Sequence, residues 1–196
     1  MTLRAYVSFL NVNLWKKYRK GHMQTDVFNK PSAWKGLETK YKKYLPDGFD
    51  PRIIVEIGVD YGYSFFHFAK DWPLTLVMGI DWYGPSALHS DAEVWVKSHL
   101  PEFPNTQLIV GDSRKAAQEW KIPIDLLHID AIHDYENLRV DFTAWEPHVR
   151  PGGVVMFHDV ISFPDMACFF WEIPGHKELI QEHHGLGYWF KPMENK

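Results

Sequence analysis

IIVEIGVDYGYSFF, residues 53–66, is the stretch that decides the fold of this chain. An apolar run ends at Glu56, Ile57 and Gly58, and Gly62 then precedes a second apolar segment. This order predicts a buried parallel strand, a tight glycine turn and the start of a helix. Such a turn brings backbone N–H groups close to a bound molecule, and a ligand that carries a nucleoside is the natural candidate.

The turn does not match the dinucleotide-binding fingerprint G-x-G-x-x-G. Its glycines stand at 58 and 62, and Asp60 occupies the position where a glycine would let the backbone approach a pyrophosphate. The Asp60 carboxylate would also repel that anion. The turn therefore argues against a nicotinamide cofactor.

Length and composition are those of one domain with a substantial core. The chain has 196 residues, 45% of them hydrophobic, and its formal net charge of −4 gives no footprint for nucleic acid. Cys168 is the only cysteine, which excludes an intramolecular disulfide framework and fits a reducing compartment, so we expect a cytoplasmic protein. Since no apolar run reaches 18 residues, we expect no transmembrane helix.

Residues 1–50 are expected to form an N-terminal helical extension. Apolar side chains recur there at helical spacing: Leu3, Val7, Leu10 and Leu14. A basic cluster follows them. We interpret the segment as a packing helix that would suit a homodimer, and a helix on a membrane surface is the alternative. A second helix is predicted over 33–44.

Strand and helix patterns alternate from residue 51 onward. Strands are predicted over 53–57, 75–80, 107–110, 124–129, 154–157, 178–182 and 186–191. Helices are predicted over 64–69, 92–99, 114–120, 135–145 and 167–172. Such alternation predicts βαβ units. We therefore expect a single Rossmann-like α/β domain over 51–196, with about seven mostly parallel strands and helices on both faces.

Polar residues and glycine stand at the carboxyl ends of the predicted strands. They are Gly58, Asp81, Asp112, Asp130, His158 and Asp159. In open α/β sheets ligands bind at that edge. The sequence thus predicts one ligand site formed by residues from five strand ends.

The pattern E-x-G-x-x-x-G-x-S over residues 56–64 resembles motif I of the class I S-adenosylmethionine (SAM) methyltransferases, and most of all the catechol type of small-molecule O-methyltransferase. The resemblance implies SAM as the cofactor. It also implies that Glu56 lies near the ammonium group of SAM. The turn would cover the methionine end through Gly58, Tyr61, Gly62 and Ser64.

Acidic residues after the next two strands are candidates for contacts with adenosine. Asp81 follows the second strand, where an acidic side chain can accept hydrogen bonds from ribose hydroxyls; a turn or helix-cap role is the alternative. Gly111, Asp112 and Ser113 follow the third strand, where Asp112 could accept from the adenine amino group. Asp112 or Ser113 could equally cap the next helix. Trp82 is a candidate for stacking on adenine or for packing.

Two further stretches, HIDAIHDY (128–135) and PGGVVMFHDV (151–160), form a second pattern. Together they resemble the macrocin O-methyltransferase-like group, and the resemblance runs from about residue 53 to 190. It implies methyl transfer from SAM to a hydroxyl of a small sugar, polyol, natural product or phenolic acceptor. The chain departs from the group's usual pattern at Ala131 and Ile132. These departures motivate the alternative of a catalytically inactive SAM-binding or regulatory module.

The resemblance aligns Asp130, His158 and Asp159 with metal ligands. A divalent cation would offset the negative charge that develops on the acceptor oxygen. Two carboxylates suit Mg²⁺, whereas the His158 imidazole leaves room for Mn²⁺, Zn²⁺ or no metal. His133 aligns with the catalytic lysine of the catechol type, so His133, with Asp130 beside it, is the candidate catalytic pair. A structural role for His133 is the alternative.

Overall fold

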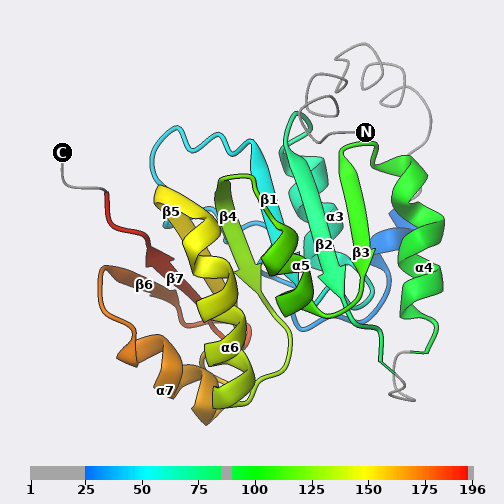
Figure 1. The fold of residues 1–196 in the computed structure, drawn as a ribbon. Helices are drawn as coiled ribbons and strands as arrows, with labels where there is room; N and C mark the ends of the chain where they lie inside the picture. The colour runs from blue at the N-terminus through cyan, green and yellow to red at the C-terminus, as the bar shows by residue number, and fades with distance from the viewer. Residues whose placement is uncertain (1–24, 85–89, 194–196) are drawn as a thin grey trace.

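The computed structural model describes residues 25–84 and 90–193, whose strands form one seven-stranded sheet (Figure 1). The strand order is β3-β2-β1-β4-β5-β7-β6. The strands are β1 (Ile53–Ile57), β2 (Leu76–Asp81), β3 (Thr106–Val110), β4 (Ile124–Ile129), β5 (Val149–His158), β6 (Lys177–Ile180) and β7 (Leu186–Phe190). Strands β1 to β5 pair in parallel, whereas β7 runs antiparallel to both β5 and β6.

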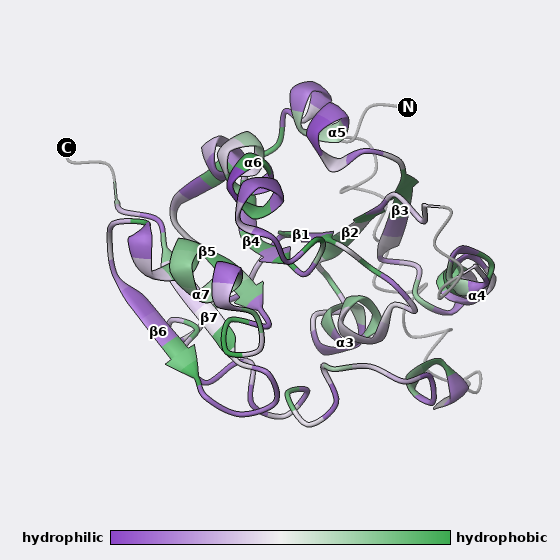
Figure 2. Ribbon diagram, turned by 90° about the horizontal axis from the view of Figure 1, so that it is seen from below, coloured by the Kyte–Doolittle hydropathy of each residue, from purple (hydrophilic) through white to green (hydrophobic). Residues whose placement is uncertain are grey.

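Helices cover both faces of the sheet. Figure 2 shows α5 and α6 on one side of the central strands and α3 on the opposite side. The helices are α3 (Tyr63–Asp71), α4 (Ala92–His99), α5 (Ser113–Glu119), α6 (Tyr135–Trp145) and α7 (Pro164–Glu172), with short 3₁₀ helices η1 (Thr25–Phe28), η2 (Leu100–Glu102) and η3 (Glu146–His148). The Rossmann-like α/β fold expected from the sequence is confirmed.

Strand β1 lies at the centre of two apolar cores, one on each face of the sheet. All five of its residues are buried. Val55 packs in the cluster shared with α5, α6 and α7, while its neighbour Ile54 packs in the cluster shared with α3. Because successive side chains of a strand point to opposite faces, a strand covered on both sides reads as a continuous apolar run.

Residues 33–44 form consecutive tight turns, and the helix predicted there is wrong. The backbone N–H of Leu37 donates to the C=O of Trp34, three residues back, and Gly36 has a φ of +95°. A left-handed residue interrupts the hydrogen-bond ladder of an α-helix. The turns nevertheless bury Trp34, Leu37 and Tyr41, which are spaced by three and four residues as on one face of a helix.

The segment 25–49 packs against α3, and its buried side chains belong to the same apolar cluster as those of that helix. The domain boundary predicted at residue 50 stays a prediction. The apolar and basic helix expected in residues 1–24 lies outside the described residues. Within the described part, no helix is both long enough and apolar enough to cross a membrane.

Candidate functional site

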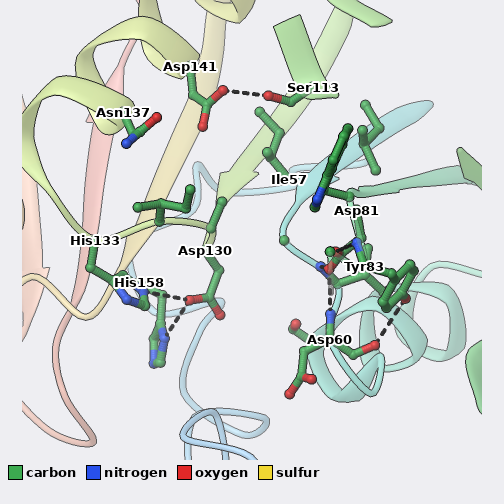
Figure 3. A pocket seen from close by; sticks show the side chains of 18 of the residues that line it. Ile57, Asp60, Asp81, Tyr83, Ser113, Asp130, His133, Asn137, Asp141 and His158 are labelled. Carbon is green, nitrogen blue, oxygen red and sulfur yellow. Dashed lines mark hydrogen bonds and ion pairs between the residues drawn. The ribbon is translucent and has the colours of Figure 1, made fainter. Parts of the chain in front are cut away.

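A cavity of about 640 Å³ opens at the carboxyl ends of β1 to β5, where the sequence predicts a ligand site (Figure 3). Twelve of the predicted site residues line it: Gly58, Tyr61, Ser64, Asp81, Trp82, Gly111, Asp112, Ser113, Asp130, His133, His158 and Asp159. Residues 31–33, which precede β1 in the sequence, also line the cavity. Glu56 and Gly62, which were also predicted, do not line this cavity.

The turn between β1 and α3 is shaped by a close approach to β4. Gly58 has a φ of +85°, and a Cβ built on it would collide with the backbone carbonyl oxygen of Asp130. Its N–H donates to the C=O of Ile80, which ties the turn to β2. Only glycine fits such a position, because it lacks the Cβ that would meet the neighbouring strand.

Glu56 lies behind the turn and is fully buried. Its Oε1 accepts a hydrogen bond from the Ser64 hydroxyl and lies 2.8 Å from Nδ1 of His128. The indole N–H of Trp34 donates to Nε2 of His128 at 3.3 Å, so Nδ1 carries the imidazole hydrogen and donates to Glu56. Burial raises the pKa of Glu56. The structure therefore places Glu56 in a buried network under the site, where it lines no part of the cavity.

Asp81 connects the end of β2 to the glycine turn. Its Oδ2 accepts from the N–H groups of Val59 at 2.7 Å and Asp60 at 2.9 Å, and its Oδ1 accepts from the N–H of Tyr83 at 2.7 Å. The next residue, Trp82, is 64% exposed and lines the cavity. Asp81 thus holds the turn and also lines the cavity.

Asp112 adopts the helix-capping role that the sequence left open. Its Oδ1 accepts from the N–H groups of Arg114 and Lys115 at the start of α5. The guanidinium of Arg114 also donates to both of its oxygens, at 3.1 Å each, and holds the pKa of Asp112 below its usual range. Ser113 instead donates to Oδ1 of Asp141 on α6 at 2.5 Å.

Two aspartates and two histidines form a charged cluster at the ends of β4 and β5 (Figure 3). Nε2 of His133 lies 3.1 Å from Oδ2 of Asp159 and 3.5 Å from Oδ1 of Asp130. Nδ1 of His158 lies 3.2 Å from Oδ1 of Asp130 and 3.4 Å from Oδ2 of Asp159. Each histidine thus contacts both carboxylates.

The charges of this cluster reinforce one another. Burial alone would lower the pKa of both histidines, but the two carboxylates outweigh it and raise the pKa of His133 to about 9 and of His158 to about 10. Burial likewise opposes ionisation of the aspartates, yet the histidines lower the pKa of Asp159 to about 2 and hold that of Asp130 well below its usual range. Without a cation, the cluster is two ion pairs.

Among the described residues, Asp130, His133 and Asp159 offer ligand atoms that all lie within 4.8 Å of one another. A divalent ion could occupy such a group. The sequence had assigned His158 to the third position and His133 to base catalysis. In the structure His158 is almost fully buried beside the carboxylates, and His133 is the histidine grouped with them. Two carboxylates and one imidazole suit Mn²⁺ or Zn²⁺ as well as Mg²⁺.

Several residues near the cluster carry no motif in the sequence. Phe163 stacks on His133 with ring centroids 4.3 Å apart, and Nδ1 of His184 lies 3.7 Å from Oδ1 of Asp159. Asn137 and Asp141 reach the cavity from α6. The spacing of four between these two, one turn of a helix, was the only signal that they share a face.

Solved structures of methyltransferases have the same fold at low sequence identity. A provisionally assigned caffeoyl-CoA O-methyltransferase from Staphylococcus aureus matches with a TM-score of 0.70 and 16% identity, over 91% of this chain and 97% of that one. The O-methyltransferase TomG from Streptomyces achromogenes, solved with SAM, matches with a TM-score of 0.56 and 18% identity, over 73% and 74%. MycE of the mycinamycin pathway, solved with Mg, S-adenosylhomocysteine (SAH) and mycinamycin VI, has a TM-score of 0.56 and 17% identity, over 93% and 54%.

Sequence comparison gives the family. The uncharacterised protein y4gI of Sinorhizobium fredii is 30% identical over an alignment of 146 residues, and the match covers 69% of this chain. The chain spans only 16% of the length of that relative. The family model described as "Methyltransferase domain" matches residues 55–160, more than half of the chain and the part that holds the glycine turn and the charged cluster. The chain therefore belongs to this methyltransferase-domain family.

Proposed function

We propose that the protein transfers the methyl group of SAM to a hydroxyl of a small molecule. The observation that carries this proposal is one cavity with two unlike ends. The glycine turn and Asp81 form one part of its wall, while Asp130, His133 and Asp159 form another. The first part suits a nucleoside with an amino-acid tail, and the second suits the activation of a hydroxyl.

The cofactor would lie along the ends of β1, β2 and β3. Asp81 would accept hydrogen bonds from the ribose hydroxyls, as acidic residues at this position do in related folds. The exposed rings of Trp82 and the side chain of Ile132 line the cavity from the ends of β2 and β4, where they would cover the two faces of adenine. The turn around Gly58 would enclose the methionine end.

His133 is the residue proposed to remove the acceptor proton. As the hydroxyl proton moves to the imidazole, an oxygen lone pair forms the C–O bond to the methyl carbon and the C–S bond breaks, which leaves SAH and a methyl ether. General base catalysis of this kind contributes about 10²–10⁴-fold in rate. His133 is partly exposed to the cavity, so an acceptor can reach it.

A divalent cation fits the same group. The carboxylates of Asp130 and Asp159 would hold it, and when bound it would supply Lewis-acid chemistry toward the acceptor oxygen while the His133 imidazole beside them stays free to act as the base. Its charge would also offset the two carboxylates that keep a proton on His133 in the cation-free cluster. Asp130 and Asp159 would therefore bind and balance charge, whereas His158 would hold both carboxylates in place from the buried side.

The acceptor would approach from the side of Phe163, whose ring covers one face of His133. Ile132 and Ile161 are exposed on the loops that follow β4 and β5. This surface suits a small hydroxylated molecule with an apolar part. A cytoplasmic location and a homodimer, both expected from the sequence, remain proposals; the unpaired, exposed thiol of Cys168 fits a reducing compartment.

Calorimetric titration with SAH tests the cofactor assignment, and titration with Mn²⁺ tests the cation site. We expect micromolar SAH binding that weakens at least about tenfold in Asp81→Asn, because hydrogen bonds to a charged acceptor are lost. Mn²⁺ binding should disappear in Asp159→Asn while SAH binding persists. Asp47→Asn, at an exposed carboxylate that does not line the cavity, is the matched control.

Each outcome has a separate meaning. No SAH binding to the wild-type chain would reject the cofactor and with it the proposed function. Mn²⁺ binding that survives in Asp159→Asn would reject the cation site. SAH binding without methyl transfer to any of a broad panel of hydroxylated acceptors would favour an inactive SAM-binding module.

A further inference from the structure

The cavity ends between α5 and α6 in a polar wall that the sequence motifs do not explain. Ser113 stands at the start of α5, while Asn137 and Asp141 stand one turn apart on α6, and all three line the cavity. Figure 3 shows the Asp141 carboxylate turned toward Ser113 across this end. The wall is on the side of β3, where the base of a nucleoside would lie if Asp81 binds its ribose.

Asp141 is nearly buried, and one of its two carboxylate oxygens accepts a hydrogen bond from another side chain. It is 8% exposed, and Ser113 donates to its Oδ1 at 2.5 Å. Among the described residues, no hydrogen bond to its Oδ2 accompanies this one. Burial raises the pKa of Asp141, and the Ser113 hydrogen bond and the nearby Arg114 guanidinium only partly offset this effect. Its Oδ2 is therefore able to accept a hydrogen bond from a ligand in the cavity.

Its neighbours leave acceptor groups at this end of the cavity, and the nearby cation, Arg114, is bound to another carboxylate. The amide nitrogen of Asn137 donates one hydrogen bond to Oδ2 of Asp134 at 2.8 Å, so its carbonyl oxygen and its second N–H remain. Arg114 is turned toward Asp112, where it binds both carboxylate oxygens. Both carboxylate oxygens of Asp112 therefore already accept hydrogen bonds from Arg114. The sequence had indicated Asp112 as the candidate acceptor for the adenine amino group.

We propose that Asp141 is the residue that recognises adenine, by accepting a hydrogen bond from its exocyclic amino group while Ser113 orients the carboxylate. This inference rests on the proposed function, since it assigns the base end of the same SAM site. A carboxylate at that position repels a base with a carbonyl oxygen in place of the amino group. The site thus selects adenosyl over inosyl cofactors.

Titration of the full chain with SAH and with S-inosylhomocysteine tests this assignment, because the two ligands differ only at the base. We expect the wild-type chain to prefer SAH by at least about tenfold, the scale of one hydrogen bond to a charged group. In Asp141→Asn the preference should fall below about threefold, because an amide can turn either its N–H or its C=O toward the base.

Asp112→Asn is the matched control and should keep the wild-type preference. A preference below threefold in the wild-type chain, or an unchanged preference in Asp141→Asn, would overturn the proposal. Loss of the preference in Asp112→Asn would return the role to that residue. Ser113→Ala provides a second, milder variant, which should reduce the preference without loss of the folded state seen by circular dichroism. If the wild-type chain bound neither ligand, the proposed function itself would fail, whereas all other negative outcomes leave SAH binding intact.

Discussion

Trp34, His128 and Glu56 form a hydrogen-bonded line of buried side chains that joins three segments distant in sequence. Trp34 comes from the turns that cover α3, His128 from the middle of β4 and Glu56 from β1. The sequence singled out Glu56 for its position before the first glycine. It gave no signal for the two partners, because a hydrogen bond between residues 94 positions apart leaves no local pattern.

Replacement of Trp34 by Phe tests the energetic value of this line. Phenylalanine keeps an aromatic ring at this buried position but is smaller than the indole, and Nε2 of His128 loses its donor and stays buried. We expect a loss of about 1–3 kcal/mol in the free energy of unfolding, the cost of an unsatisfied buried polar group. Urea unfolding followed by far-UV circular dichroism measures it.

Trp171→Phe is the matched control, because Trp171 is 57% exposed. Its replacement should alter the free energy of unfolding by no more than about 0.5 kcal/mol. Equal losses in the two variants would show that the bond to His128 contributes nothing. A loss confined to Trp34→Phe would place the energy at the buried site of Trp34, in its bond to His128 together with its packing.

At the scale of elements, the unit of β1, its glycine turn and α3 controls the site. The turn contacts β2 through Ile80 and Asp81 and approaches β4 at the backbone of Asp130. A ligand that binds the turn therefore meets the ends of three strands at fixed positions. The turn also explains why a single Cβ at residue 58 would disturb both the fold and the cavity.

Gly58→Ala and Gly48→Ala separate this close approach from ordinary backbone strain. Both glycines have positive φ, +85° and +70°, but a Cβ at 48 meets nothing within 4 Å. We expect Gly48→Ala to cost about 1–2 kcal/mol through left-handed strain alone. Gly58→Ala adds a clash with backbone and should cost at least about 3 kcal/mol.

Thermal and urea unfolding of the two variants provide the comparison, and SAH titration of any folded Gly58→Ala protein adds a second readout. We expect weaker SAH binding in Gly58→Ala and unchanged binding in Gly48→Ala. Similar stabilities for the two variants would show that β4 yields at residue 130 and that the close approach does not constrain the turn.

At the scale of the whole molecule, two cores sandwich the sheet, and one of them depends on segment 25–49. Phe28 of that segment packs on His67 of α3 with ring centroids 4.2 Å apart, and Tyr63 flanks the same imidazole at 4.8 Å. Burial, together with the nearby charge of Lys70, lowers the pKa of His67 to about 4. Docking of the segment is thus coupled to the protonation of one histidine.

This coupling predicts acid sensitivity. An unfolded chain binds the His67 proton near pH 6.5 and the folded chain only near pH 4, so the unfolded state gains protons first. The contribution to stability is complete above pH 6.5 and decreases as the pH falls toward 4. We expect His67→Gln to reduce the loss of stability between pH 7 and pH 4.5 by about 1–2 kcal/mol, after allowance for solvent screening.

Urea unfolding at the two pH values measures the difference. His176→Gln, at an exposed histidine, is the control and should lose as much stability as the wild-type chain. If His67→Gln showed the full wild-type loss, protonation of His67 would not contribute to acid unfolding.

Sequence patterns alone predicted most of the fold. The bounds of β1, β4, α4 and α6 agree with the expected ranges residue for residue. Each of these elements buries an apolar run or face whose period is visible in one dimension. The strand-end residues Asp81, Asp130 and Asp159 were also recognisable, because parallel strands bring their carboxyl ends to one edge.

Only the tertiary structure determined which side chains lie in contact. The Arg114 guanidinium binds Asp112, whereas Asp141 accepts a hydrogen bond at Oδ1 from Ser113. His133 lies near Asp130 and Asp159 because the loops after β4 and β5 lie side by side. The periodicity over 33–44 was real, yet Gly36 turned the segment into successive turns. Local pattern therefore determined the elements and their edge, whereas contacts between residues far apart in sequence determined the partners of each functional group, because those contacts depend on packing in three dimensions.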